Sequence, residues 1–156
     1  MKGELERKIV LKHAELTVWR KLNALQQNNK FNELANLIGY TFMEIIFASK
    51  KLGKQLNEEK TMLREHGTRR SKILKVVLAR LRAAPNLGIF APPYSPPDRC
   101  HELTGNRKGQ LTIDLDDPYR LVFIPAHEPL PKRAEGGLDW SQVTAIEIRG
   151  VEDTHA

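Results

Sequence analysis

Residues 110–124, QLTIDLDDPYRLVFI, carry the signature of a β-hairpin. Polar and apolar side chains alternate with period two over residues 111–115, as they do in a strand that buries one face. The next three residues, Asp-Asp-Pro at 116–118, favour a turn, and β-prone residues return over 119–124. The stretch therefore predicts two antiparallel strands joined by a tight turn.

Two further strands are expected, one before and one after this hairpin in the sequence. A β-prone run lies at 42–48, and an alternating run lies at 143–151, after a segment rich in proline and glycine. The alternation of the second run changes phase near Gly150, which predicts a β-bulge there.

Two helices are expected between the first strand and the hairpin. Ser49 can cap the first helix, Gly67 ends it, and the second helix covers 68–84. The apolar residues of the first helix recur at helical spacing: Leu52, Leu56 and Leu63. Residues 85–98 contain five prolines and are predicted to form an extended surface connector.

These elements define an α+β domain in the order β-α-α-β-β-β. The two helices form a hairpin that packs on a small, mainly antiparallel sheet. We place this domain at residues 43–156 and a helical extension at residues 1–42, where apolar residues recur at roughly helical spacing.

The charge of the chain is unevenly distributed. Of 156 residues, 25 are Lys or Arg and 19 are Asp or Glu, which gives a net charge of +6. The excess of positive charge lies in the predicted helical half, while the second half is net negative. This asymmetry suits a polyanion such as RNA or DNA, or an acidic protein partner, although Lys and Arg also simply solvate exposed helix faces.

The single cysteine, Cys100, excludes an internal disulfide, and no apolar run is long enough for a membrane helix. The N-terminus lacks the pattern of a secretory signal, so a cytoplasmic protein without membrane contact is expected. The five histidines are scattered without the spacing of a zinc site, and no phosphate-binding glycine loop is present. We therefore expect no metal and no cofactor.

The polar run RCHELTGNRKGQ, residues 99–110, precedes the hairpin, and the chain closes on Glu-Asp-Thr-His at 152–155. Together with Arg120, these segments hold imidazoles, guanidiniums and a carboxylate, which are the groups needed to bind a phosphodiester and move protons on it.

These motifs resemble the RelE/ParE superfamily of toxins from type II toxin–antitoxin modules, and most closely its HigB-like, or plasmid-maintenance killer, branch. The resemblance covers residues 43–155 and rests on three separated motifs in the expected order. The matching residues are His101, Leu103, Gly105, Arg107, Gly109, Tyr119, Arg120, Phe123, Asp153 and His155. The chain departs from the family pattern at Thr104, where lysine is frequent, at Asn106, where aspartate is frequent, and at Thr154, where tyrosine is frequent.

The resemblance implies a toxin that inhibits translation by ribosome-dependent cleavage of mRNA, with the substrate's own 2′-hydroxyl as nucleophile and no metal. His101 and His155 would be the acid–base pair, with Asp153 orienting an imidazole and Arg120 holding the scissile phosphate. Four further cations are candidates for RNA binding: Arg99, Arg107, Lys108 and Arg149. The implied partners are the ribosome, mRNA and a cognate antitoxin of the helix-turn-helix type.

Other interpretations of these residues stay open. Arg120 can form a salt bridge with Asp114 across the hairpin, His155 can be a frayed terminal residue, and His101 can cap a turn. Cys100 beside His101 is a weaker candidate nucleophile, because neighbours on a strand point to opposite faces. At the level of the whole protein, the alternative is a non-catalytic binding protein of the same fold, either a gyrase inhibitor or a degenerate toxin.

Overall fold

The computed structural model describes residue 33 and residues 37–155. The chain divides into two compact units, Met1–Tyr40 and Thr41–Ala156, and the second unit carries the fold described below. The helices expected within residues 1–42 lie almost entirely outside the described residues.

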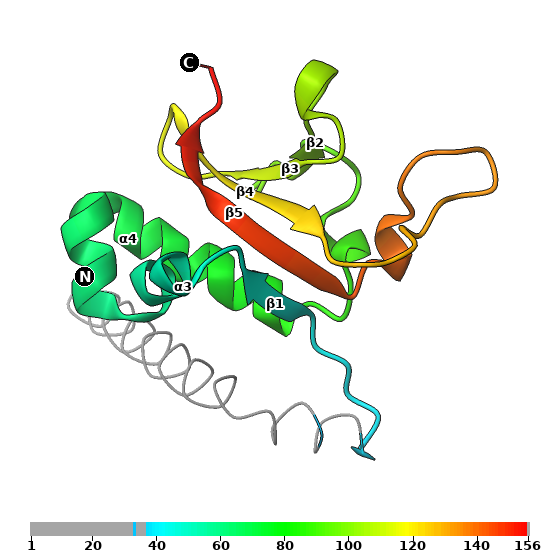
Figure 1. The fold of residues 1–156 in the computed structure, drawn as a ribbon, viewed down its shortest axis with the longest axis horizontal. Helices are drawn as coiled ribbons and strands as arrows, with labels where there is room; N and C mark the ends of the chain where they lie inside the picture. The colour runs from blue at the N-terminus through cyan, green and yellow to red at the C-terminus, as the bar shows by residue number, and fades with distance from the viewer. Residues whose placement is uncertain (1–32, 34–36, 156) are drawn as a thin grey trace, which may run out of the picture. The chain divides into compact units, whose positions relative to one another are not determined.

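The second unit is an α+β domain with a five-stranded mixed sheet (Figure 1). Its elements are β1 (Glu44–Phe47), α3 (Lys50–Asn57), α4 (Glu59–Ala83), β2 (His101–Glu102), β3 (Leu111–Asp114), β4 (Tyr119–Pro125) and β5 (Ala145–Asp153). The strand order is β1-β5-β4-β3-β2. β1 runs parallel to β5, and every other neighbouring pair is antiparallel. The α+β class is confirmed, and the short edge strand β2 is an addition to the expected order.

The predicted hairpin is confirmed as β3 and β4. Leu111 pairs with Phe123 and Ile113 pairs with Leu121, and all four side chains are fully buried. Their alternate positions along each strand point to the other face of the sheet, where Asp114 lies opposite Arg120. Between these two pairs on the other face, Thr112 lies opposite Val122, and both are fully buried, so the second face is buried at its centre and polar at the end that carries Asp114 and Arg120.

The expected bulge near Gly150 is also confirmed. Val122 pairs with Gly150, but the next residue, Phe123, pairs with Ile148, so Arg149 is the extra residue of β5. This insertion lets β5 keep Ile146 and Ile148 in the core while its last residues continue along β4.

The first helix ends earlier than predicted. Ser49 does cap α3, since its hydroxyl accepts the Leu52 N–H at 3.1 Å, but the backbone leaves the helical region at Glu58 and α4 starts there. This break changes which face is buried, so that Leu63, which was expected on the apolar face, is 39% exposed, and its neighbour Met62 is fully buried instead. The predicted break at Gly67 is present as a kink with φ of 74°.

The extended connector predicted at residues 85–98 is wrong in its first part. Leu87–Phe90 form a 3₁₀ turn, η1, in which Leu87 and Phe90 are buried. Two contacts fix the turn, because the Asn86 side chain accepts the Gly88 N–H and the Leu87 N–H donates to the Val143 carbonyl. Burial of two large apolar residues outweighs the preference of the flanking prolines for an extended surface path.

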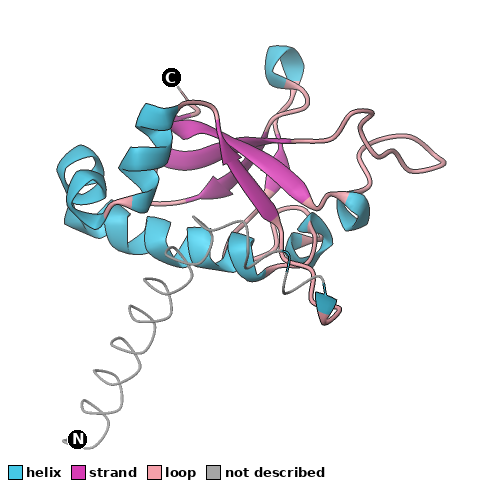
Figure 2. Ribbon diagram, turned by 60° about the horizontal axis from the view of Figure 1, so that its bottom comes forward, coloured by secondary structure: helices cyan, strands magenta, loops and turns pink. Residues whose placement is uncertain are grey.

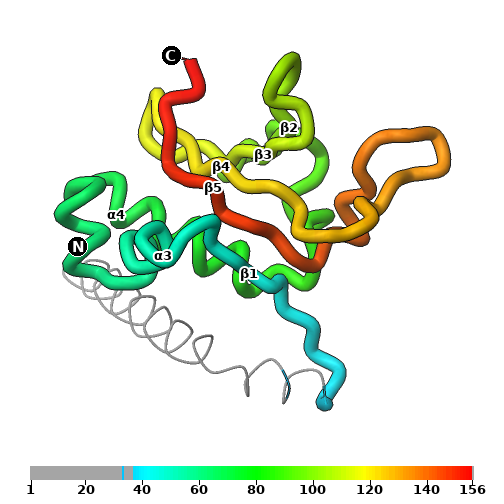
Figure 3. The backbone as a smooth tube through the Cα atoms, viewed as in Figure 1, coloured from blue at the N-terminus to red at the C-terminus, as the bar shows by residue number. Residues whose placement is uncertain are grey.

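The helices cover one face of the sheet (Figure 2). The 3₁₀ turn η2 (Gly105–Arg107) and the C-terminal residues both rise from the sheet on the side away from α4 (Figure 3). We call this uncovered side the open face. Within residues 37–155, no helix has the length and apolar character needed to cross a membrane.

One ion pair ties the hairpin turn to α4. Arg70 donates from Nε and Nη2 to the two carboxylate oxygens of Asp116, at 2.6 and 3.2 Å, and its guanidinium also lies 3.4 Å from the centre of the Tyr119 ring. The hydrogen bond from Arg70 lowers the pKa of Asp116. The pair therefore joins the turn to the helix layer by charge-assisted hydrogen bonds.

We expect Asp116→Asn to lower the free energy of unfolding by about 1–2 kcal/mol at neutral pH, because Arg70 loses a charged acceptor. Since the pKa of Asp116 is lowered in the fold, this contribution is complete above the unfolded pKa of about 4 and is lost as the pH falls through the folded value. Chemical denaturation of both proteins across the acid range measures it. The exposed neighbour gives the control, Asp117→Asn, and an equal loss in both variants would contradict the assignment.

Candidate functional site

The pairing register brings polar residues from four strands together on the open face. His101 of β2 lies opposite Thr112 of β3, and Asp114 of β3 lies opposite Arg120 of β4. Arg120 in turn lies opposite Glu152 of β5. Because directly opposed residues share a face, all five side chains project from the same side of the sheet.

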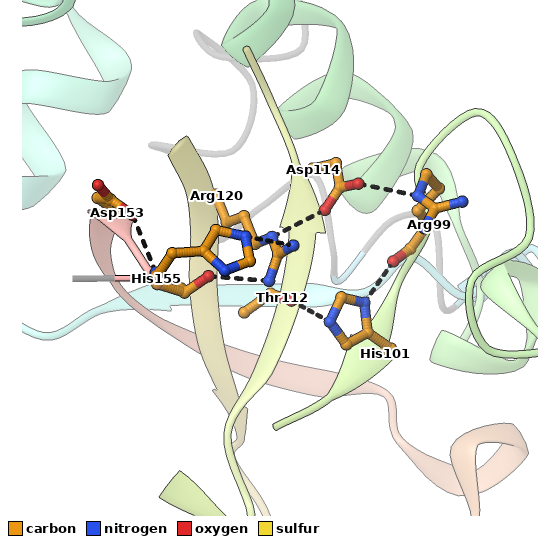
Figure 4. Close-up of polar contacts among 8 residues, drawn as sticks. Arg99, His101, Thr112, Asp114, Arg120, Asp153 and His155 are labelled. Carbon is orange, nitrogen blue, oxygen red and sulfur yellow. Dashed lines mark hydrogen bonds and ion pairs between the residues drawn. The ribbon is translucent and has the colours of Figure 1, made fainter. Parts of the chain in front are cut away.

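Arg120 is the centre of this cluster (Figure 4). Its Nε lies 3.1 Å from Asp114 Oδ1, its Nη1 donates to the Thr154 hydroxyl at 2.8 Å, and its Nη2 donates to Nε2 of His155 at 3.2 Å. The cross-strand salt bridge with Asp114 is thus present, and the same guanidinium also holds the last turn of the chain. Two of its five N–H groups remain for a ligand.

His101 is 5% exposed and has a defined tautomer. Its Nδ1 lies 2.7 Å from the Arg99 carbonyl oxygen, which can only accept, so Nδ1 carries a proton. In the neutral ring Nε2 is then unprotonated, and it lies 3.4 Å from the Thr112 hydroxyl. His101 therefore belongs to a strand in the cluster instead of capping a turn, and its unprotonated nitrogen lies beside the Thr112 hydroxyl.

His155 is exposed but anchored. Its Nε2 accepts from Arg120, so that nitrogen is also unprotonated in this state. Asp153 holds the backbone of the same turn, because its Oδ1 accepts the His155 N–H at 2.9 Å. Asp153 lies opposite Tyr119, on the other face of β5 from Glu152, and in Figure 4 its carboxylate points away from Arg120. Asp153 thus contacts the backbone of His155 and not its ring.

Of the four candidate RNA-binding cations, two lie in the cluster and two lie outside it. Arg99 donates to Asp114 Oδ2 at 3.0 Å, and Arg107 reaches from η2 to Glu152 Oε2 at 2.7 Å, so both join the cluster. Lys108 is exposed at the end of η2, and Arg149 is exposed at the bulge, where it pairs with Glu147.

Electrostatically, the cluster is close to balanced. Three guanidiniums, those of Arg99, Arg107 and Arg120, share the two carboxylates of Asp114 and Glu152. The surplus of one positive charge, together with the unused N–H groups, can bind a phosphate oxygen, and the two imidazoles of the same face can accept or donate protons.

Several residues of this site were not predicted as functional. Glu152 and Thr112 could have been found from the period-two alternation, because they occupy the same phase as Arg120 and Asp114 in their strands. Tyr94 has no such signal. It lies in the proline-rich segment and reaches the site only through the fold, where its ring stacks on His101.

Two other kinds of site, a reactive cysteine and a metal centre, are not supported by the described residues. Cys100 is fully buried, and burial raises the pKa of its thiol, so a reactive thiolate is disfavoured. Among the described residues, no three His, Cys, Asp or Glu side chains are grouped closely enough to hold a metal ion.

Comparison with known proteins gives no relative. No family model, no curated protein and no solved structure matches the chain.

The burial of Cys100 is open to a direct test. In the native protein we expect thiol reagents to modify this residue only at the rate of unfolding, and to modify it rapidly in denaturant. Because the chain has one cysteine, total label reports this site alone, with the denatured protein as the control. Rapid native labelling would mean that the thiol reaches solvent.

Proposed function

We propose that this chain is a metal-independent endoribonuclease toxin of a type II toxin–antitoxin module, which inhibits translation by cleaving mRNA on the ribosome in the cytoplasm. The observation that carries the proposal is the pair of imidazoles, His101 and His155, that accompany the Arg120 guanidinium on the open face. RNA cleavage without a metal needs such a pair and fixed positive charge at the phosphate.

In the proposed reaction the scissile phosphate accepts from the free N–H groups of Arg120 and also from the N–H that bonds His155 at rest. His101 Nε2 removes the proton of the neighbouring 2′-hydroxyl, whose oxygen attacks phosphorus. The bond from phosphorus to the 5′-oxygen breaks, and His155 gives that oxygen a proton. The products are a 2′,3′-cyclic phosphate and a 5′-hydroxyl, so atoms and charge balance without an added reactant.

The resting hydrogen bonds set the condition for these roles. His101 has the right form for a base, because the Arg99 carbonyl keeps the proton on Nδ1. His155 must gain a proton to act as an acid, and its Nε2 is occupied by Arg120 in the resting state. A phosphate that accepts from Arg120 releases Nε2, and its negative charge favours the protonated imidazole.

A non-catalytic binding protein is the second candidate function. Each of the three guanidiniums on the open face already has a carboxylate partner, and His101 is almost fully buried. These features favour a structural network, in which case the chain would act only by docking on a partner such as gyrase or an antitoxin.

The two candidates give different results in cells. After induced expression, mapping of mRNA 5′ ends is expected to reveal discrete cuts bearing 5′-hydroxyls. We expect His101→Ala and His155→Ala each to reduce cleavage by at least about 100-fold, because a positioned acid or base contributes about 10²–10⁴-fold. Arg120→Ala is expected to do the same, through the loss of phosphate binding.

Arg133→Ala is the matched control for Arg120→Ala, because Arg133 is an exposed arginine of the β4–β5 connection, paired only with the neighbouring Glu135. It should leave cleavage unchanged. Growth arrest that survives both histidine substitutions, with intact mRNA, would reject the nuclease and support the binding protein, and trapped DNA breaks would identify gyrase as its target.

A further inference from the structure

The proline-rich segment before β2 forms a strained turn at the edge of the site. Tyr94 and Arg99 have φ of 66° and 48°, and they are the two non-glycine residues with positive φ in the described part of the chain. Residues other than glycine rarely adopt this backbone conformation, and strain of this kind concentrates at binding and catalytic sites. The strained turn is therefore a candidate part of the site.

Hydrogen bonds hold the strained turn in place. The Tyr94 N–H donates to the Cys100 carbonyl at 2.9 Å, and the Arg99 N–H donates to the Ser95 carbonyl at 2.8 Å. The Asp98 carbonyl accepts the Asp114 N–H at 3.0 Å, which fastens the turn to the end of β3. The backbone is thus fixed at both positive-φ residues, so the direction of each side chain is set by the fold.

The turn presents the Tyr94 ring beside the proposed base. The ring stacks on the His101 imidazole, with 4.1 Å between centroids and 17° between planes. Tyr94 nevertheless stays 52% exposed, and the Arg99 guanidinium carbon lies 5.7 Å from its ring centre. An aromatic that served only to pack His101 could bury its ring, whereas this one keeps half of its surface in water.

We propose that Tyr94 is a stacking platform for one base of a single-stranded RNA, a site that fixes which nucleotide lies next to His101. Proteins bind unpaired bases by stacking them on aromatic rings and bind the connecting phosphates with nearby cations. Arg99 is such a cation, since its side chain is about half exposed although it pairs with Asp114. This inference rests on the proposed function for its ligand and extends it to a base-recognition subsite.

Binding of an RNA that cannot be cut tests the platform separately from catalysis. The probe is a short 2′-O-methyl RNA, which lacks the attacking hydroxyl, together with a series in which one base at a time is removed. Fluorescence anisotropy gives the dissociation constant. We expect Tyr94→Ala to raise it by roughly 5- to 100-fold, and Tyr94→Phe, which keeps the ring, by less than about 2-fold.

The base-removal series distinguishes stacking from a general loss of structure. Removal of one particular base should weaken binding to the wild-type chain by a similar factor and have no further effect in Tyr94→Ala, as in a double-mutant cycle. Ile89→Ala is the control, because Ile89 is a comparably exposed apolar residue of the same proline-rich segment. Thermal unfolding confirms that each variant is folded.

The outcomes separate this inference from the nuclease proposal. Unchanged affinity in Tyr94→Ala, effects of base removal that simply add to that substitution, or no binding by the wild-type chain would each overturn the platform. Cleavage that depends on both histidines would still support the nuclease in those cases. Conversely, coupling between Tyr94 and one base in a protein that cuts no mRNA would support the platform and reject the nuclease.

Discussion

The pairing of Asp114 with Arg120 across the hairpin is the interaction on which the site depends. Asp114 accepts from Arg99 with one carboxylate oxygen and lies against Arg120 with the other, so it joins the proline-rich turn to β4. Arg120 extends the connection to the last turn of the chain through Thr154 and His155. One carboxylate therefore positions groups from three parts of the sequence that are far apart along the chain.

Local pattern was enough to predict the parts of the fold in which one face is buried. The alternation over 110–124 and the phase change near Gly150 correspond to β3, β4 and the bulge, because period two directly encodes which side chains enter the core. The break at Glu58 could not be predicted, since neither Asn57 nor Glu58 interrupts a helical pattern. With the break at this position, Leu56 before it and Met62 after it are both fully buried.

The site was predictable only at positions where a residue of the right chemical type also points to the open face of its strand. Arg120 and His101 occupy strand positions, so their common face follows from register once the strands are known. Asp153 has the right residue type but the wrong phase, one residue from Glu152, and so its carboxylate serves the backbone of the terminal turn. Tyr94 and Arg99 depend on positive φ values that no periodic pattern encodes.

Because the arginines of the site are already paired with carboxylates, the groups that attract a polyanion from a distance differ from the groups that recognise it in the site. A phosphate that enters the site can use the two free N–H groups of Arg120, but it must share the charge of the guanidiniums with Asp114 and Glu152, which already pair with them. Little net energy is then gained from charge alone, and selectivity must come from geometry, that is, from the fork of Arg120, the two imidazoles and the Tyr94 ring. The exposed cations Lys108, Lys50 and Lys51 would instead provide the long-range attraction of a polyanion. A site built this way holds the groups proposed for catalysis in place before the ligand arrives, and it binds weakly any anion that does not fit all of them.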